Sequence, residues 1–319
     1  HILETEPDNF FAHHQLGLIA ISTGNDVIAA EFISTAVTIN PASPQAHYDL
    51  GVVFQRLGQL QNANASYRKS ISLKHNFPEA HNNLGLVLRE SGNISEAIQC
   101  YRNAINIQDR YTAAHSNLGL ALHDIGAFDK ALTSFRKALA INYDIAEVHY
   151  NLGTTLQALG RLSEAVESFR LCLSLNPKIA EAHTNLGLAL RDLGKLGEAS
   201  TSYKTAISIN PNSAEAHHNL GMLQLLEGNY VDGWENYGWR WKIRKRACHP
   251  IALDKPLWDG TKAYGKTIYV YSEQGLGDAI QFVRYLPLLK VEGYRVVLES
   301  PPSLKRLFQH SEVADEVIE

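Results

Sequence analysis

Residues 78–111 read PEAHNNLGLVLRESGNISEAIQCYRNAINIQDRY, and this pattern returns along most of the chain. Its Leu-Gly pair recurs every 34 residues, and a second glycine follows each first one after seven residues. The first column comprises Gly17, Gly51, Gly85, Gly119, Gly153, Gly187 and Gly221. The second comprises Gly24, Gly58, Gly92, Gly126, Gly160, Gly194 and Gly228. A fixed period of this length predicts a stack of seven identical structural units.

Each unit is predicted to be a helical hairpin. The first glycine lets two antiparallel helices approach without a Cβ between them, and the second suits the left-handed residue that ends the first helix. In residues 78–111, one apolar stripe of the first helix faces a second stripe on the second helix. The stripes comprise Ala80, Leu84 and Leu88, and Ala97, Tyr101, Ala104 and Ile105.

The pattern closely resembles the tetratricopeptide repeat, whose closing proline stands at Pro7, Pro41, Pro177 and Pro211. At three successive junctions His75, Asp109 and Tyr143 replace it, which predicts slightly more flexible middle junctions. The resemblance implies a right-handed α-solenoid over residues 10–247. Residues 1–9 match the tail of a preceding repeat. The seventh unit, altered by Gly233 and a group of tryptophans, is predicted to be a cap.

Composition excludes several classes of function. The net charge of −4, from 29 basic and 33 acidic residues, creates no basic field for nucleic acid. Cys100, Cys172 and Cys248 form no CxxC pair, so we expect no disulfide framework, no metal site and no cofactor. No apolar run suggests a spanning helix, and a reducing, cytoplasmic location fits best. Because the chain begins at His1, we expect it to be part of a longer protein.

A column of amides lies directly before the Leu-Gly pairs: Gln15, Asp49, Asn83, Asn117, Asn151, Asn185 and Asn219. We call its five asparagines the asparagine column. On the concave side of a solenoid, such carboxamides can pair with successive peptide groups of an extended ligand. The alternative is that each amide bonds to the backbone or to the next first helix. The tetratricopeptide domain of O-GlcNAc transferases has a similar asparagine ladder that holds substrate polypeptide, and this resemblance favours the first interpretation.

Two further sets of polar residues follow the same period. Glutamates near the starts of first helices either select ligand side chains or form a solvated face: Glu79, Glu147, Glu181 and Glu215. A histidine column is predicted to serve packing and inter-helix hydrogen bonding: His13, His47, His81, His115, His149, His183 and His217. Equivalent residues lie roughly 10 Å apart, too far to share a metal ion at about 2 Å.

After a predicted linker at 248–262 the periodicity changes. Alternation predicts strands at 267–271 and 295–298, helices at 279–289 and 304–310, and the start of a strand at 317–318. Residues 263–319 are therefore predicted to be an incomplete Rossmann-like α/β segment. In its first turn, Gly275 and Gly277 offer close backbone approach, but Ile280 replaces a third glycine. Asp278 is most simply explained as a helix N-cap.

The stretch Pro256-Leu257-Trp258-Asp259-Gly260 through Gly275-Leu276-Gly277-Asp278 resembles bacterial tetratricopeptide proteins that carry a heptosyltransferase-like glycosyltransferase domain. That resemblance implies that Asp278 is the candidate base for an acceptor hydroxyl and that Gly275 and Gly277 form an acceptor or phosphate loop. It also implies that a nucleotide sugar is bound only by a second domain, downstream of this chain.

Two functions remain open. The first is a scaffold that presents a protein or other acceptor to an attached, nucleotide-sugar-dependent glycosyltransferase, with no transfer by residues 1–319 alone. The second is a pure protein interaction scaffold with a non-catalytic α/β appendage.

Overall fold

The computed structural model describes residues 2–243, 256, 258, 260–262, 264–272 and 275–319. The chain divides into two compact units, residues 1–223 and 224–319. The greater part of the predicted linker, 248–262, lies outside the described residues. In the described part, no helix is both long and apolar enough to cross a membrane.

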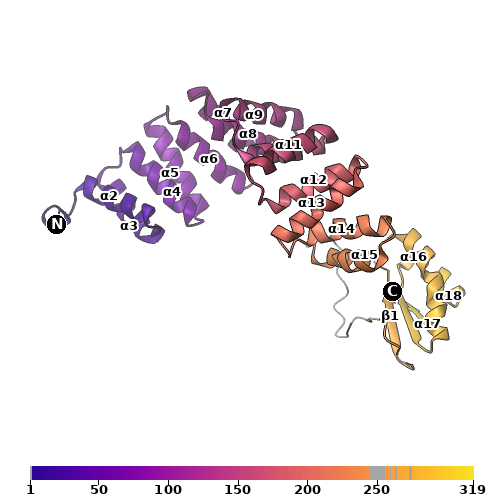
Figure 1. Ribbon diagram of the computed structural model, residues 1–319. Helices are drawn as coiled ribbons and strands as arrows, with labels where there is room; N and C mark the ends of the chain where they lie inside the picture. The colour runs from indigo at the N-terminus through magenta and orange to yellow at the C-terminus, as the bar shows by residue number, and fades with distance from the viewer. Residues whose placement is uncertain (1, 244–255, 257, 259, 263, 273–274) are drawn as a thin grey trace. The chain divides into compact units, whose positions relative to one another are not determined.

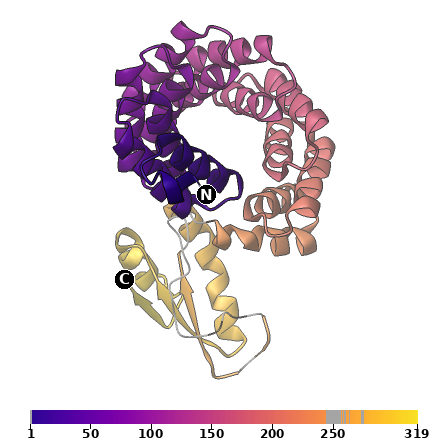
Figure 2. The same cartoon turned by 90° about the vertical axis from the view of Figure 1, so that its left-hand side faces the viewer.

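The N-terminal unit is built from antiparallel helix pairs that stack in chain order (Figures 1 and 2). Each second helix packs against its own first helix, and the first five second helices also pack against the first helix of the next pair. After a short α1 (Ile2–Thr5), the pairs are α2 (Phe10–Ser22) and α3 (Asp26–Ile39), α4 (Pro44–Arg56) and α5 (Leu60–Leu73), α6 (Pro78–Glu90) and α7 (Ile94–Ile107), α8 (Thr112–Asp124) and α9 (Phe128–Ile141), α10 (Ala146–Ala158) and α11 (Leu162–Leu175), and α12 (Ala180–Asp192) and α13 (Leu196–Ile209). Helix α14 (Ala214–Leu226) follows.

The second glycine column ends the first helices, as predicted. Each of its seven glycines has a positive φ, between 71° and 83°. In the third repeat the amide of Gly92 donates to the oxygen of Arg89, and the next amide, that of Asn93, donates to Leu88. This left-handed turn reverses the chain with little steric cost only when the residue lacks a Cβ.

Five glycines of the first column, from Gly51 to Gly187, make room for a ring rather than for a neighbouring backbone, and Gly17 makes room for Ile33. A Cβ built at Gly51, Gly119 or Gly153 would lie 2.6–2.7 Å from ring atoms of the second helix in the same pair. The rings that fill these spaces are fully buried: Tyr67, Tyr101, Phe135, Phe169 and Tyr203. The prediction that these positions have no room for a Cβ is therefore confirmed, but the cause is an aromatic ring rather than the approach of two backbones.

The histidine column fastens the loop that precedes each first helix. Every one of the seven imidazoles places Nε2 within 2.7–3.2 Å of the main-chain oxygen six residues earlier. His81 and His149 make this contact where His75 and Tyr143 replace the closing proline. The prediction that these histidines bond to another helix was thus wrong, because each imidazole bonds to a main-chain oxygen of the loop before its own helix. The same contact at all seven junctions gives no sign that the middle ones differ.

The C-terminal unit contains a three-stranded parallel sheet in the order β1 (Thr267–Tyr271), β2 (Arg295–Glu299), β3 (Glu316–Ile318). Helix α18 (Pro302–His310) buries Leu304 and Phe308 against Val296 and Leu298. The helix predicted over 279–289 is instead divided into α16 (Leu276–Phe282), η2 (Val283–Tyr285) and α17 (Leu286–Val291). Pro287 lies in the first turn of α17, where its missing N–H interrupts a continuous helix.

The same unit begins with the end of α14 and with α15 (Tyr230–Tyr237) and η1 (Gly238–Lys242). Basic side chains lie over aromatic rings here: Lys242 over Trp239, and Arg240 over Tyr237 and Trp241. Trp234 is 61% exposed.

Candidate functional site

The asparagine column lies on successive first helices, from α6 to α14. All five side chains are half-buried, so each amide can be reached from solvent. At the corresponding places Gln15 is exposed and Asp49 is buried. We call the surface that carries this column the first-helix face.

Part of the column joins neighbouring repeats. Asn83 Nδ2 donates to the hydroxyl of Tyr48 at 3.1 Å, and Asn185 Nδ2 donates to the hydroxyl of Tyr150 at 3.1 Å. Asn117 Nδ2 donates to Asn82 Oδ1 at 2.9 Å. In each case the acceptor belongs to the preceding repeat, 35 residues earlier in the sequence. These three bonds are the inter-helix links that the structural alternative predicts.

The column is not used uniformly. Asn83 is engaged at both ends, because Asn82 Nδ2 also donates to its Oδ1 at 3.2 Å. Asn117 and Asn185 each keep an amide oxygen without a donor among the described residues. Asn151 and Asn219 make no side-chain hydrogen bond to any residue that the structure describes. Two of the five amides are therefore wholly available to a ligand.

Whether an asparagine of the column is available depends on the side chain 35 residues earlier, which stands directly before the column position of the preceding repeat. Tyr48, Asn82 and Tyr150 are long enough to meet the next repeat. Ser116 and Thr184 occupy the same column but are short, and the hydroxyl of Thr184 donates to Ala180 of its own helix. These residues were not considered in the sequence analysis, although they recur every 34 residues along the chain.

Between the first and second repeats, the corresponding side chains are both ionisable. His14 Nε2 lies 2.8 Å from Asp49 Oδ2, and both residues are buried. Gln45 donates to both oxygens of the carboxylate. Burial raises the pKa of Asp49, while the hydrogen bonds from His14 and Gln45 act in the opposite direction. Burial also raises the pKa of Tyr48 and of Tyr150, so both phenols are neutral at pH 7, and each hydroxyl accepts from its asparagine.

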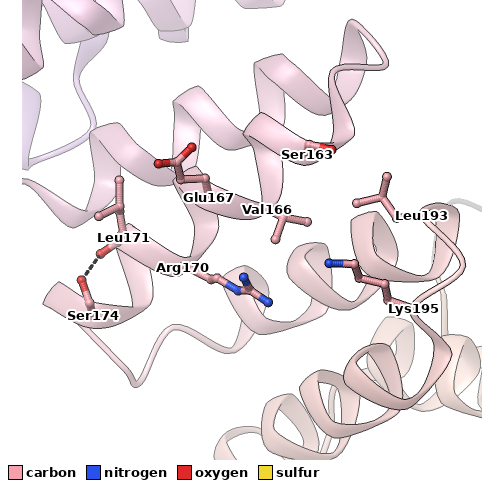
Figure 3. A pocket seen from close by; sticks show the side chains of 8 residues that line it. All are labelled: Ser163, Val166, Glu167, Arg170, Leu171, Ser174, Leu193 and Lys195. Atoms are coloured by element: carbon pink, nitrogen blue, oxygen red, sulfur yellow. Dashed lines mark hydrogen bonds between the residues drawn. The ribbon is translucent and has the colours of Figure 1, made fainter.

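Among the hollows on the described repeats, two bear on the choice of a site. One, of about 420 Å³, is on the first-helix face and is lined by Gln55, Leu86, Arg89, Glu90 and Asp124. Arg89 Nε donates to Asp124 Oδ2 at 2.6 Å across it. The other, of about 600 Å³, lies beside the second helix α11 (Figure 3).

Figure 3 shows Arg170 and Lys195 at the rim of that second hollow. Both cations are within ion-pair distance of the carboxylate of Glu198, at 2.6 Å and 3.9 Å. Each of these cations has a partner in the protein, so the carboxylate of Glu167 is the one ionic group of the lining without an ion pair among the described residues. The first-helix face is the better candidate site.

In the C-terminal unit Asp278 is exposed on the first turn of α16, after the carboxyl end of β1. The N-cap of this helix is Gly275, so the interpretation of Asp278 as the N-cap was wrong. Asp278 is the third residue of the helix and makes no hydrogen bond to the described residues. A Cβ at Gly275 or Gly277 would meet no described atom within 4 Å, so local packing does not require either glycine.

Models of known families match the repeats. The model described as "TPR repeat" matches residues 56–89, 85–126 and 187–228, and the model described as "Tetratricopeptide repeat" matches residues 109–178. Together they cover more than half of the sequence. The chain is a tetratricopeptide-repeat protein. This family assignment, together with the helical array, supports a protein-binding scaffold. A search of curated proteins finds no match.

Solved structures share the fold of this tetratricopeptide-repeat protein. YrrB, described as a TPR protein with an unusual peptide-binding site, is 23% identical with a TM-score of 0.51, over 59% of this chain and 97% of YrrB. PilF of Pseudomonas aeruginosa is 23% identical with a TM-score of 0.59, over 69% and 97% of the two chains. A chain of the APC/C hetero-tetramer Cut9–Hcn1 is 20% identical with a TM-score of 0.60, over 70% and 44%.

Proposed function

We propose that the first-helix face holds an extended segment of another polypeptide. The observation that carries this proposal is the pair of unengaged amides, Asn151 and Asn219, on a column whose other members bond to the protein itself. A half-buried amide without partners is costly unless water or a ligand satisfies it. A carboxamide supplies one acceptor and two donors, which match the C=O and N–H of a peptide group.

The remaining atoms of the column extend the same surface. The free oxygens of Asn117 and Asn185 accept from ligand N–H groups, and Asn151 and Asn219 both donate and accept. Asn83 takes no part, because the repeats already use its two polar ends. In this arrangement the main chain of the ligand is held mostly from α8 to α14.

Side-chain amide NMR tests the proposal directly. The probe is an uncharged peptide of serine, threonine and alanine, added to protein labelled with nitrogen-15 on asparagine. We expect the side-chain NH₂ signals of Asn151 and Asn219 to shift on binding and those of Asn83 to stay in place.

Fluorescence anisotropy with the same labelled peptide gives the affinities. Asn151→Ala/Asn219→Ala should weaken binding about tenfold, since each lost hydrogen bond contributes about 0.5–1.5 kcal/mol. Asn62→Ala/Asn103→Ala, on the second helices α5 and α7, is the matched control and should leave affinity unchanged. Equal affinities for wild type and both variants would reject the asparagine column as the binding surface.

We further propose, from the resemblance stated for residues 256–278, that the bound segment is presented to a nucleotide-sugar-dependent glycosyltransferase in a cytoplasmic bacterial protein. Asp278 would take the proton of an acceptor hydroxyl while that oxygen bonds to the anomeric carbon and the nucleotide leaves. Its exposure after the carboxyl end of a parallel strand suits this role, because such edges bind ligands in α/β sheets. The open space at Gly275 and Gly277 admits an acceptor close to the backbone. The nucleotide sugar would be held by a further domain.

Sugar transfer by the full-length protein tests this second step. Asp278→Asn should lower the rate about 10²–10⁴-fold, the usual contribution of a general base, with peptide affinity unchanged. Asp232→Asn, on the exposed surface of α15, serves as the control. Absence of transfer and of nucleotide-sugar hydrolysis in the full-length wild type would leave the pure scaffold as the function.

A further inference from the structure

Four exposed glutamates lie near the starts of the first helices. Glu79, Glu147, Glu181 and Glu215 are exposed, and none belongs to an ion pair among the described residues. We call Glu147, Glu181 and Glu215, which follow one another in successive repeats, the acidic row. Each of them lies four positions before an asparagine of the column, namely Asn151, Asn185 and Asn219, so glutamate and amide share one face of each helix.

Three glutamates of the second helices form ion pairs with arginines of the neighbouring repeat. Arg68 pairs with Glu96, Arg136 with Glu164 at 3.6 Å, and Arg170 with Glu198 at 2.6 Å. Each pair joins two neighbouring repeats, and Glu164 and Glu198 each have a second cation nearby, Arg161 at 2.6 Å and Lys195 at 3.9 Å. These three glutamates of the second helices have cation partners, whereas the three of the acidic row have none among the described residues.

The acidic row acts on the same surface as the amides. Glu181 and Glu215 both raise the pKa of Tyr150, after the larger effect of burial, and the hydroxyl of Tyr150 accepts from Asn185. The fields of two glutamates therefore overlap where the ligand main chain is expected to lie. An acidic ligand is repelled at this place, and a basic one is attracted.

Repeat geometry sets the spacing of the charges on the ligand. Packed helices lie about 10 Å apart, and an extended chain of the polyproline II type rises about 3.1 Å per residue with three residues per turn. Every third side chain then points in the same direction and meets the next repeat. Such a chain also leaves its N–H and C=O groups unbonded and available to amides.

We propose that the first-helix face from α10 to α14 selects an extended polypeptide with lysine or arginine at every third position. The free amides bind its main chain, and the acidic row binds its basic side chains. The inference rests on the proposed peptide-binding function and adds the chemistry of the ligand. It does not depend on any transfer reaction.

The probes are three labelled peptides of about twelve residues, with lysine, glutamate or glutamine at every third position between serines. Fluorescence anisotropy at low and at moderate salt gives their affinities. We expect the lysine peptide to bind about thirtyfold more tightly than the glutamine peptide, at about threefold per carboxylate, and to lose this advantage as salt rises. The glutamate peptide should bind most weakly.

Two matched triple variants locate the effect. Glu147→Gln/Glu181→Gln/Glu215→Gln should bring the lysine peptide to the affinity of the glutamine peptide. Glu96→Gln/Glu164→Gln/Glu198→Gln removes the same charge from the second helices and should leave the preference intact. Circular dichroism is expected to show the same helix content in both.

The outcomes separate this inference from the function on which it rests. Equal binding of the lysine and glutamine peptides, or equal loss in both triple variants, would overturn the basic specificity while peptide binding stands. If no peptide binds, in wild type or variant, both the proposed function and the inference fail.

Discussion

A Cβ built at Gly85 would lie 2.5 Å from Cε1 of Tyr101, whose ring is fully buried. The ring is held on its other sides by the packed core and has no room to retreat. We therefore expect Gly85→Ala to destabilise the protein by about 1–3 kcal/mol, the usual range for overpacking. Urea denaturation measures the change.

The matched control is Gly197→Ala, on the exposed surface of α13, where a Cβ meets nothing within 4 Å. This substitution should stabilise by about 0.4–1 kcal/mol, because alanine loses less backbone entropy in a helix. Equal effects of the two alanines would show that the ring does not depend on the glycine.

The hydrogen bond between each histidine of the column and its loop should contribute measurably to the free energy of unfolding. His149 Nε2 lies 2.9 Å from the oxygen of Tyr143, and the same oxygen also accepts from the amide of Ile145. His149→Phe keeps a ring but removes the bond, without leaving the carbonyl unsatisfied. We expect a loss of about 0.5–1.5 kcal/mol in thermal unfolding. A loss above about 3 kcal/mol would mean that the histidine does more than fasten the loop.

Acid should weaken the repeats through the same column. Burial lowers the pKa of His81, and its buried Nδ1 has no partner among the described residues. A lowered folded pKa means that the unfolded chain takes up the proton first as pH falls. The stability contributed by neutral His81 is then fully present above about pH 6.5 and is lost as pH falls through the folded pKa.

We expect the free energy of unfolding to fall between pH 7 and pH 5, and to fall less steeply in His81→Phe. Urea denaturation at several pH values gives both slopes. Parallel slopes in wild type and variant would assign the acid sensitivity to other groups.

The buried carboxylate of Asp49 should make stability depend on pH in the opposite direction to His81. Because burial raises its pKa, its stabilising contribution is fully present below about pH 3.8 and is lost as pH rises through the folded pKa. At pH 7 Asp49→Asn should therefore stabilise the protein by up to about 1 kcal/mol, with His14 donating to the new amide oxygen. Destabilisation by this substitution would contradict the raised pKa of Asp49.

The asparagines of the column should differ in what they contribute to stability. Asn83→Ala removes both of its inter-residue bonds and should cost about 1–2 kcal/mol. Asn151→Ala removes none and should change the free energy of unfolding by less than about 0.5 kcal/mol. Calorimetric unfolding of the two variants at one pH makes the comparison. Equal losses would contradict the assignment of Asn151 as a free amide.

The sequence by itself determined the repeat architecture. A hairpin in such a stack contacts only its neighbours, so the 34-residue period, the positive-φ glycines and the column of Tyr101 suffice to specify every pair. The strands of the C-terminal unit were also predictable, since short alternating β-branched runs such as 267–271 carry their own signal.

Only the tertiary structure decided which polar residues are free. Whether an asparagine bonds to its neighbour depends on a side chain 35 residues away, long at Tyr150 and short at Ser116, and on the contact between two first helices. Likewise, Asp278 lies inside α16 because the helix begins at Leu276, and a helix boundary depends on where the preceding strand ends. Local patterns specify elements, whereas the availability of a functional group depends on what the packed chain places beside it.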